Sequence, residues 1–540
     1  MAQSGPRLAT RAQSRVSSRD EATIAYIKKI LCSRPPTAGT DPDVPTRKIE
    51  DSSLEELLPP LTSSNEVDIQ LYALIAVILS NFVQTWYNRI TPDQQFVSEI
   101  VQIIAHCTRG LEQRLRKVDL EGLLLDEVPD LLATHVRAIK TCRASRTGSP
   151  TAREVQLRYH ALNPHVALEP LPLDDDTAHR QSENETAWCL LLVNRVLPLL
   201  LPPEDLQNPC LDVLVSEVFA ELIFRNGICG KACEPWLIWD GVAKLLRSLR
   251  SVKGTLPKNS SVPLNRLDEY GLLAASRASE DPLPHGRPRR RFDALSHTFW
   301  FTMQCVITAW VLLRACFIAL MQAGTLPARS SRNPSKSKAS EGVPVTTNTI
   351  SGLVETPSAT KAKRPIVDMH IWGCISEVLS LDQRMPWLSG ILSLVQRLSL
   401  QGPGQLCQTN SRLDRLMSST IHQRLLAAAP DWLPPVLQAA RSALFPDNVL
   451  AAGRAQPPSS DEVVEIKREC ARAIVEAMMP DVVGAAFFAT KDHDLMREDV
   501  EAQVLDLLAD AYVNKHLVVL AVELIVVRLF PELGSIAAGR

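Results

Sequence analysis

One uninterrupted apolar segment, Ser296 to Ala323, constrains this 540-residue chain more than any other feature. It contains no proline, glycine or acidic residue, and it carries one full charge, Arg314. About 26 residues without a helix breaker predict a continuous helix roughly 39 Å long, which is enough to cross a bilayer. The chain must therefore place this helix in a large apolar core, against lipid, or across a membrane.

The distribution of polar and apolar side chains around this helix helps to choose between those three environments. At 100° per residue, small and polar side chains fall in one narrow sector, whereas large apolar side chains fill most of the rest. The narrow sector holds Gln304, Thr308, Ala315, Ala319 and Gln322, and the large apolar group includes Phe299, Met303, Val306, Trp310, Leu313 and Phe317. Arg314 and Gln304 disfavour a span, because a central arginine costs about 2.5 to 3.5 kcal/mol on insertion scales.

We therefore expect helix 297–323 to pack in the folded body or to wall a lipid cavity. Trp310, Leu313 and Phe317 are the candidate cavity-lining or membrane-facing residues. Insertion into a membrane surface and a single transmembrane span at 297–323 are the two alternatives.

Four arginines, Arg287, Arg289, Arg290 and Arg291, lie just before the apolar run. A basic cluster next to an apolar helix is typical of contact with anionic headgroups, where each basic residue contributes about 1 kcal/mol. The sequence therefore predicts anionic-lipid contact at these four residues.

The overall charge excludes one class of partner. Lysine and arginine number 58 against 60 aspartates and glutamates, so the formal net charge is −2. No general nucleic-acid surface is present, and we expect no nucleic-acid partner. The twelve cysteines are scattered, and the close pair Cys229 and Cys233 has no second Cys/His pair at zinc spacing, which favours reduced, buried thiols.

No motif for catalysis, a cofactor or a metal is present. The chain has no glycine-rich phosphate loop, no Gly-x-Ser-x-Gly, no His-Glu-x-x-His and no EF-hand loop. We interpret the acidic run 174–176 as a solvated loop and Asp494 as a helix cap. His135 and His516 fall on predicted helices, where hydrogen-bonded structural roles are favoured. The prediction is a protein that is not an enzyme, with no catalytic residue, cofactor or metal.

Helical periodicity dominates the chain, and no stretch alternates for long enough to require a sheet, so the predicted class is all-α. The predicted division follows composition and helix signals. It comprises a basic disordered tail with one short helix (1–62), a first helical domain (63–250), a linker with the basic cluster (251–295), the long apolar helix (296–323), a disordered basic linker (324–365) and a second helical domain (366–540).

The first helical domain contains an ordered series of short motifs. The segment Trp86-Tyr87-Asn88-Arg89-Ile90-Thr91-Pro92-Asp93 is followed by a leucine-rich helix to His135 and a Tyr-His-Ala-Leu element at Tyr159 to Leu162. Leu199-Leu200-Leu201-Pro202-Pro203 continues the pattern. In this order the motifs resemble the PX-associated, or PXA, domain of sorting nexins. The family's His-Pro-Ala-Leu is split here, since Pro164 follows His160-Ala161-Leu162-Asn163.

The second helical domain contains four motifs: the Trp387-Leu388 region, Leu444-Phe445-Pro446, Asn514-Lys515-His516-Leu517 and the closing Leu529-Phe530-Pro531-Glu532-Leu533. In order and spacing these motifs resemble the sorting-nexin C-terminal, or nexin-C, domain. We recognise no PX domain and no regulator-of-G-protein-signalling module between the two, so the chain resembles a reduced member of a kind found in fungi.

These resemblances imply two helical domains packed into one elongated body around an apolar core or cavity. They imply a lipid-binding, membrane-associated adaptor of the sorting-nexin type, with phospholipid or phosphoinositide, a membrane surface and trafficking proteins as partners. Lipid transfer in endosomal or vacuolar trafficking, or at organelle contacts, is part of that expectation. The implied location is cytoplasmic, peripheral on endosomal, vacuolar or ER membranes. The alternative is a non-enzymatic interaction scaffold in endomembrane trafficking.

Overall fold

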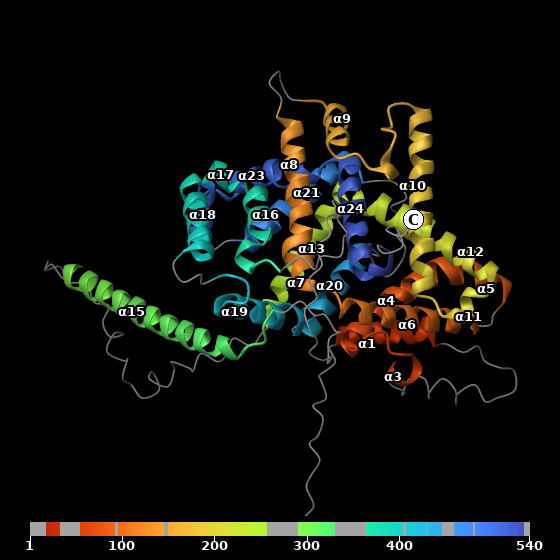
Figure 1. Ribbon diagram of the computed structural model, residues 1–540, viewed down its shortest axis with the longest axis horizontal. Helices are drawn as coiled ribbons and strands as arrows, with labels where there is room; N and C mark the ends of the chain where they lie inside the picture. Colours follow the sequence, from red (N-terminus) through yellow and green to blue (C-terminus); the bar gives the residue numbers. More distant parts are fainter. Residues whose placement is uncertain are drawn as a thin grey trace, which may run out of the picture. The chain divides into compact units, whose positions relative to one another are not determined.

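The computed structural model describes residues 18–32, 54–91, 95–144, 150–255, 290–329, 363–402, 407–427, 429–444, 458–478 and 481–533. Regular structure in these residues is helical throughout, without a strand, and this confirms the predicted all-α class (Figure 1). The chain divides into two compact units. Unit 1 takes residues 1–118, 137–251 and 429–540, and unit 2 takes residues 119–136 and 252–428.

Unit 1 is built from helices of both the N-terminal half and the C-terminal end. Its N-terminal helices are α1 (Ser18–Leu31), α3 (Leu54–Leu57), α4 (Asn65–Ile78), the π-helix η1 (Leu79–Gln84), α5 (Thr85–Ile90) and α6 (Gln95–Leu115). These are followed by α9 (Ala152–Leu162), η3 (Val166–Leu168), α10 (Asp175–Val196), η4 (Leu197–Leu199), α11 (Pro203–Leu206), α12 (Pro209–Glu217), η5 (Val218–Gly230), η6 (Lys231–Cys233) and α13 (Pro235–Thr255). The C-terminal helices are α20 (Ala429–Leu444), α21 (Ser460–Met478), α22 (Asp481–Phe488), α23 (His493–Gln503), η12 (Leu505–Leu508) and α24 (Ala511–Leu529).

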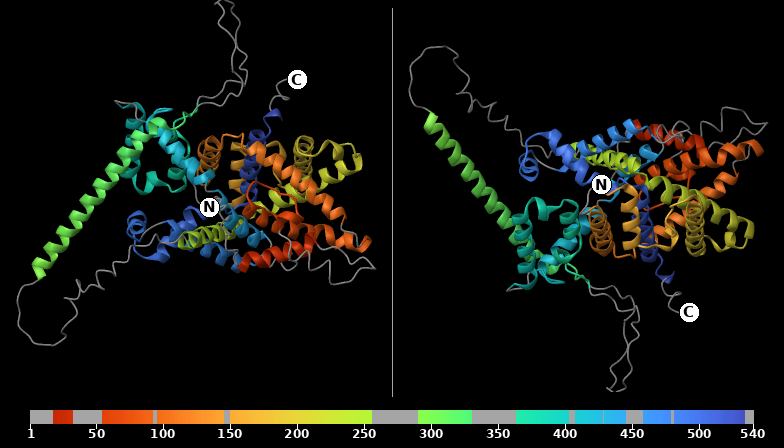
Figure 2. Two further views of the ribbon diagram at one scale, coloured as in Figure 1. Left: turned by 90° about the horizontal axis from the view of Figure 1, so that it is seen from below. Right: turned by 90° about the horizontal axis from the view of Figure 1, so that it is seen from above.

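Unit 2 contains the long apolar helix and the helices that follow it. Its elements are α7 (Leu120–Gly122), η2 (Leu123–Glu127), the first half of α8 (Val128–Arg143), α15 (Arg290–Gln322), η8 (Ala323–Thr325), η9 (Ile366–Asp368), α16 (Ile371–Val378), α17 (Leu381–Arg384), α18 (Pro386–Gln401), α19 (Arg412–Ile421) and η10 (His422–Ala427). Figure 2 shows α15 as one unbroken rod from two further directions.

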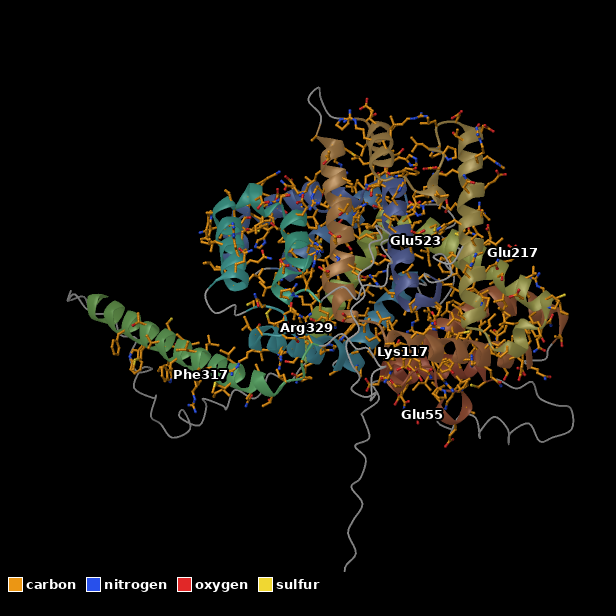
Figure 3. The ribbon with its side chains drawn as sticks, in the orientation of Figure 1. Glu55, Lys117, Glu217, Phe317, Arg329 and Glu523 are labelled. Atoms are coloured by element: carbon orange, nitrogen blue, oxygen red, sulfur yellow. The ribbon has the colours of Figure 1, made fainter. Side chains whose placement is uncertain are left out.

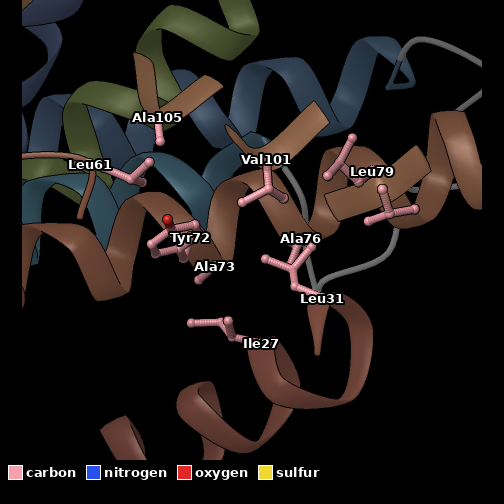
Figure 4. Close-up of a cluster of buried hydrophobic side chains, with 10 residues drawn as sticks. Ile27, Leu31, Leu61, Tyr72, Ala73, Ala76, Leu79, Val101 and Ala105 are labelled. Atoms are coloured by element: carbon pink, nitrogen blue, oxygen red, sulfur yellow. The ribbon is translucent and has the colours of Figure 1, made fainter. Parts of the chain in front are cut away.

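Small residues let α1 and α4 approach closely in the first apolar core of unit 1. Ala73 and Ala76 of α4 are fully buried against Ile27 of α1, while α6 contributes Val97 and Val101 (Figure 4). Tyr72 is 2% exposed, and its hydroxyl donates to the carbonyl oxygen of Pro59, so burying this side chain leaves no unpaired polar group.

Two further cores of unit 1 join the N-terminal half to the C-terminal end. Trp239 of α13 packs with Cys470 of α21 and Val500 of α23. Val519 of α24 packs with Cys189 of α10 in a separate cluster. The C-terminal end of the chain is therefore part of the same apolar interior as the N-terminal helices.

Polar contacts orient α24 within unit 1. Glu523 accepts hydrogen bonds from the indole nitrogen of Trp188, at 3.0 Å, and contacts the ring of His165 at 3.2 Å. The hydrogen bond from His165 lowers the pKa of Glu523 from its usual value. Lys515 forms a 2.8 Å ion pair with Glu185 of α10. These contacts place the polar residues of an otherwise apolar helix against specific partners in α10 and the loop before it.

Candidate functional site

The candidate site is the surface of α15, which the sequence singled out. The 33-residue helix begins at Arg290 and ends at Gln322, where η8 follows and Ala323 is fully buried. At 1.5 Å per residue the helix is about 50 Å long. It packs against α19 near its C-terminal end, so unit 2 holds α15 at that end.

The predicted site residues of α15 are exposed. Trp310, Leu313 and Phe317 are 65%, 64% and 62% exposed, and they lie on one side of the helix. Nine other large apolar side chains of α15 are exposed as well: Phe299, Trp300, Met303, Val306, Ile307, Val311, Leu312, Ile318 and Met321. The expectation that helix 297–323 packs inside the folded body, or walls an internal cavity, is wrong for this structure. Its apolar surface faces outward and needs another covering.

By length and composition, the segment Thr302–Thr325 is the one stretch among the described residues that could cross a membrane, and none of its apolar window is buried in the protein. Its hydroxyl groups suit an apolar environment. Thr308 donates to the carbonyl oxygen of Gln304 at 2.7 Å, and Thr302 donates to that of Phe299 at 2.8 Å. Both hydroxyls are therefore satisfied inside the helix, which lowers the cost of placing them in lipid.

A buried charge cluster anchors the chain just beyond α15, around Arg329, which is labelled in Figure 3. Arg329 forms a 2.6 Å ion pair with Glu121 and contacts both carboxylate oxygens of Asp414 at 2.8 Å. The three side chains are 4%, 3% and 1% exposed. Breaking such a pair typically costs about 3 to 5 kcal/mol, because a charge is then left buried without a partner.

Further hydrogen bonds complete this cluster, which we call the Arg329 clasp (Arg329, Glu121 and Asp414). Asp414 accepts from the backbone amides of Ile366 and Asn410 at 3.0 and 2.9 Å. Ser418 donates to Glu121 at 2.8 Å. The clasp thus connects the end of α15 to α7, α19 and the start of η9.

The segment predicted as a disordered linker, 324–365, contributes ordered contacts at both of its described ends. Besides Arg329, Lys363 forms a 2.9 Å ion pair with Asp119 at the other end. No sequence signal identified either residue, since an isolated arginine or lysine in a Ser/Pro-rich stretch resembles a solvated one. Residues 330–362 lie outside the described residues.

The predicted basic cluster is only partly described. Arg287 and Arg289 lie outside the described residues, and Arg290 and Arg291 are the first two residues of α15. Arg291 is 19 positions before Trp310, which is about 28 Å along a helix. Arg290 and Arg291 therefore lie at the N-terminal end of α15, in a different part of the helix from the apolar candidates.

The polar groups that could suggest chemistry have structural partners. Asp174 caps α10 in a capping box with Thr177, and Asp176 pairs with Arg180 at 2.8 Å. The cap of α23 is Asp492 and not Asp494, because Asp492 accepts from the backbone amide of Asp494 at 2.9 Å. Across the described part of the chain, no group of three His, Cys, Asp or Glu side chains could hold a metal ion.

The two predicted structural histidines are buried. His135 is 3% exposed, and burial lowers its pKa to about 4, so the ring is neutral at pH 7. His516 of α24 is fully buried against the rings of Tyr159, His160 and Tyr512.

Comparison with known proteins identifies the N-terminal helices. Residues 64–245 match the family model of the PXA domain. These residues form a PXA domain. The resemblance found in the first helical domain is thereby confirmed, whereas the nexin-C resemblance stays a prediction.

Several known proteins are similar to part of the chain. PXA domain protein 1 of Schizosaccharomyces pombe is 32% identical over 158 residues, covering 29% of this chain and 30% of that protein. Sorting nexin-14 of Danio rerio is 24% identical over 160 residues, covering 30% and 16%, and human sorting nexin-13 is 25% identical over 165 residues, covering 30% and 17%. The chain thus spans less than a third of the length of these relatives, and none of their names denotes an enzyme. No solved structure matches the chain.

Proposed function

We propose that the protein is a non-enzymatic, membrane-associated adaptor of the sorting-nexin type that binds phospholipid through α15. The supporting observation is the exposed surface of α15, which carries twelve large apolar side chains. Between residues 294 and 322 this helix has no acidic residue and one arginine. An apolar surface on most sides of a helix is too broad for one packed protein face, and lipid can cover it while the narrow polar sector with Gln304 and Thr308 faces headgroups or water.

The PXA domain and the similarity to sorting nexins support a trafficking role on endosomal, vacuolar or ER membranes. Phosphoinositide is an alternative headgroup, and lipid transfer between organelles is a further step of the same proposal. The Arg329 clasp suits this role, because it holds the membrane-facing helix to the folded part of unit 2.

The test places charge on the proposed lipid-facing surface. Leu313→Glu/Phe317→Glu should abolish lipid co-purification and reduce flotation with phosphatidylserine-containing vesicles by at least roughly tenfold, about 1.4 kcal/mol. Gln304→Glu/Thr308→Glu is the matched control, since it adds two charges to the polar side of the same helix. Equal lipid binding by the two double variants would contradict the proposal.

Extraction of the native protein from membranes distinguishes a surface helix from a transmembrane helix. If α15 lies on the membrane surface, high salt or alkaline carbonate should release the protein. Release by detergent alone would identify α15 as a transmembrane anchor. A native protein that stays in the soluble fraction and carries no bound lipid would instead favour the interaction-scaffold alternative.

A further inference from the structure

A second helix of unit 2, α18, also carries an outward apolar stripe. Trp387, Ile391, Leu394, Val395 and Leu398 are 63%, 51%, 57%, 56% and 58% exposed. Their spacing of four, three, one and three residues places them within a sector of about 100°. Such a stripe normally faces a protein core, yet here it faces outward.

Contacts on the other side of α18 fix this orientation. The side-chain amide of Gln396 donates to the carbonyl oxygen of Val367 at 2.8 Å, and Ser389 is hydrogen-bonded to Asp382 of α17. Leu388, Ser399 and Leu400 are half-buried. The side of α18 that packs on η9 and α17 thus combines Ser389, Gln396 and Ser399 with two half-buried leucines, and the apolar stripe has no covering among the described residues of unit 2.

The polar side of α18 is nearly uncharged. From Pro386 to Gln401 it contains serine, glycine and glutamine, no acidic residue or lysine, and one arginine, Arg397. Attraction to anionic headgroups adds about 1 kcal/mol per basic residue, so electrostatics can supply little of any membrane affinity here. Burial of large apolar side chains, worth about 1.5 to 3 kcal/mol each when complete, must supply most of it.

We propose that α18 is an interfacial helix that recognises membranes by their lipid-packing defects and not by their charge. Insertion of Trp387 and four aliphatic side chains requires gaps between headgroups, which are more frequent in curved or unsaturated membranes. This proposal rests on the proposed membrane association and adds a second contact with a different lipid preference, since the region around α15 also carries the basic cluster.

A second copy of the chain is a less suitable occupant. A 16-residue helix is about 24 Å long, and a stripe about 10 Å wide gives roughly 240 Å² per copy. Stable interfaces bury about 800 Å² per partner. The stripe alone is therefore too small for a stable dimer, whereas a single helix of this size can insert its apolar side into the surface of a bilayer.

Flotation of the full-length protein tests the proposal. Small, highly curved vesicles of neutral dioleoylphosphatidylcholine are compared with large vesicles of saturated phosphatidylcholine. Leu394→Glu, in the middle of the stripe, should lower binding to the small neutral vesicles roughly tenfold, about 1.4 kcal/mol. Ser393→Glu is the matched control, because it adds the same charge one residue away on an exposed position outside the stripe, and its binding should be unchanged.

A second readout reports insertion directly. Vesicles with brominated acyl chains should quench tryptophan emission of the full-length protein, and Trp387→Phe should reduce the quenched component. Equal flotation of Leu394→Glu and Ser393→Glu, or an unchanged quenched component in Trp387→Phe, would overturn the proposal. So would conversion of a dimer to a monomer by Leu394→Glu, since a second copy would then cover the stripe.

Failure of this inference is distinguishable from failure of the proposed function. If Leu313→Glu/Phe317→Glu loses vesicle binding and Leu394→Glu binds normally, the proposed function of α15 is supported and the one proposed for α18 is contradicted. Absence of binding to every vesicle, neutral or anionic, would overturn both.

Discussion

Arg329 is the residue whose contacts fix the C-terminal end of α15. Its guanidinium pairs with two buried carboxylates, Glu121 and Asp414. Asp414 also accepts hydrogen bonds from the backbone amides of Ile366 and Asn410, and Glu121 accepts one from the hydroxyl of Ser418. Removal of the arginine leaves both carboxylates in a site from which water is excluded. The stability of unit 2 should therefore depend strongly on this single side chain.

Replacing Arg329 with methionine should lower the free energy of unfolding of unit 2 by about 3 to 5 kcal/mol, because two buried charges lose their partner. Chemical denaturation followed by circular dichroism measures this change. Arg250→Met is the control, since Arg250 and Glu476 form an ion pair that is more than half exposed on both sides, and such pairs contribute about 0 to 1 kcal/mol. Similar losses for the two variants would show that the clasp contributes no more than a surface pair.

At the residue scale the sequence predicts apolar positions better than polar partners. Trp310, Leu313 and Phe317 were identified as lipid-facing candidates from helical spacing alone, and their exposure is compatible with that role. Arg329 was assigned to a linker, because a buried ion pair depends on residues 85 to 208 positions away in the chain. Local sequence carries no information on such a partner.

At the scale of elements, helix limits follow local signals closely. The predicted helix 296–323 ends within one residue of α15, which spans Arg290–Gln322. Pro129, which has no backbone amide hydrogen to donate, lies in the first turn of α8, directly after the π-helical segment Leu123–Glu127. The exposure of a helix cannot be predicted in the same way as its limits. A helix with the composition of α15 can also lie in a protein core, so the sequence does not show whether its apolar surface is buried or exposed.

The N-terminal end of α15 provides a prediction at this scale. Replacing Arg289, Arg290 and Arg291 with glutamine should weaken binding to phosphatidylserine vesicles by up to about 3 kcal/mol, because each arginine contributes about 1 kcal/mol near an anionic surface. The residual binding should also be less sensitive to salt. Flotation at low and high ionic strength measures both effects, and binding to neutral vesicles is the control. Unchanged affinity and salt dependence would exclude this end of the helix as a headgroup contact.

At the scale of the whole molecule, the packing of unit 1 differs from the order of the chain. The predicted boundaries separate a PXA-like domain from a nexin-C-like domain, yet unit 1 combines 1–118 and 137–251 with 429–540. The final helix, α24, packs against α6, α9 and η5, which all belong to the N-terminal part of unit 1.

The C-terminal segment should accordingly fail to fold alone. In unit 1, α24 depends on PXA-domain partners, because Glu523 accepts from Trp188, Lys515 pairs with Glu185 and Asn514 donates to the carbonyl oxygen of Cys233. A fragment of residues 366–540 loses all three contacts and exposes the apolar side of α24 around Val519, which is fully buried in the complete chain. We expect this fragment to be insoluble, or soluble without a cooperative unfolding transition, and we expect co-expression with residues 1–365 to recover a soluble complex. Size-exclusion chromatography and thermal unfolding followed by circular dichroism measure these outcomes. A soluble, monomeric fragment with a cooperative transition would show that the C-terminal helices form a domain that needs no contact with the PXA domain.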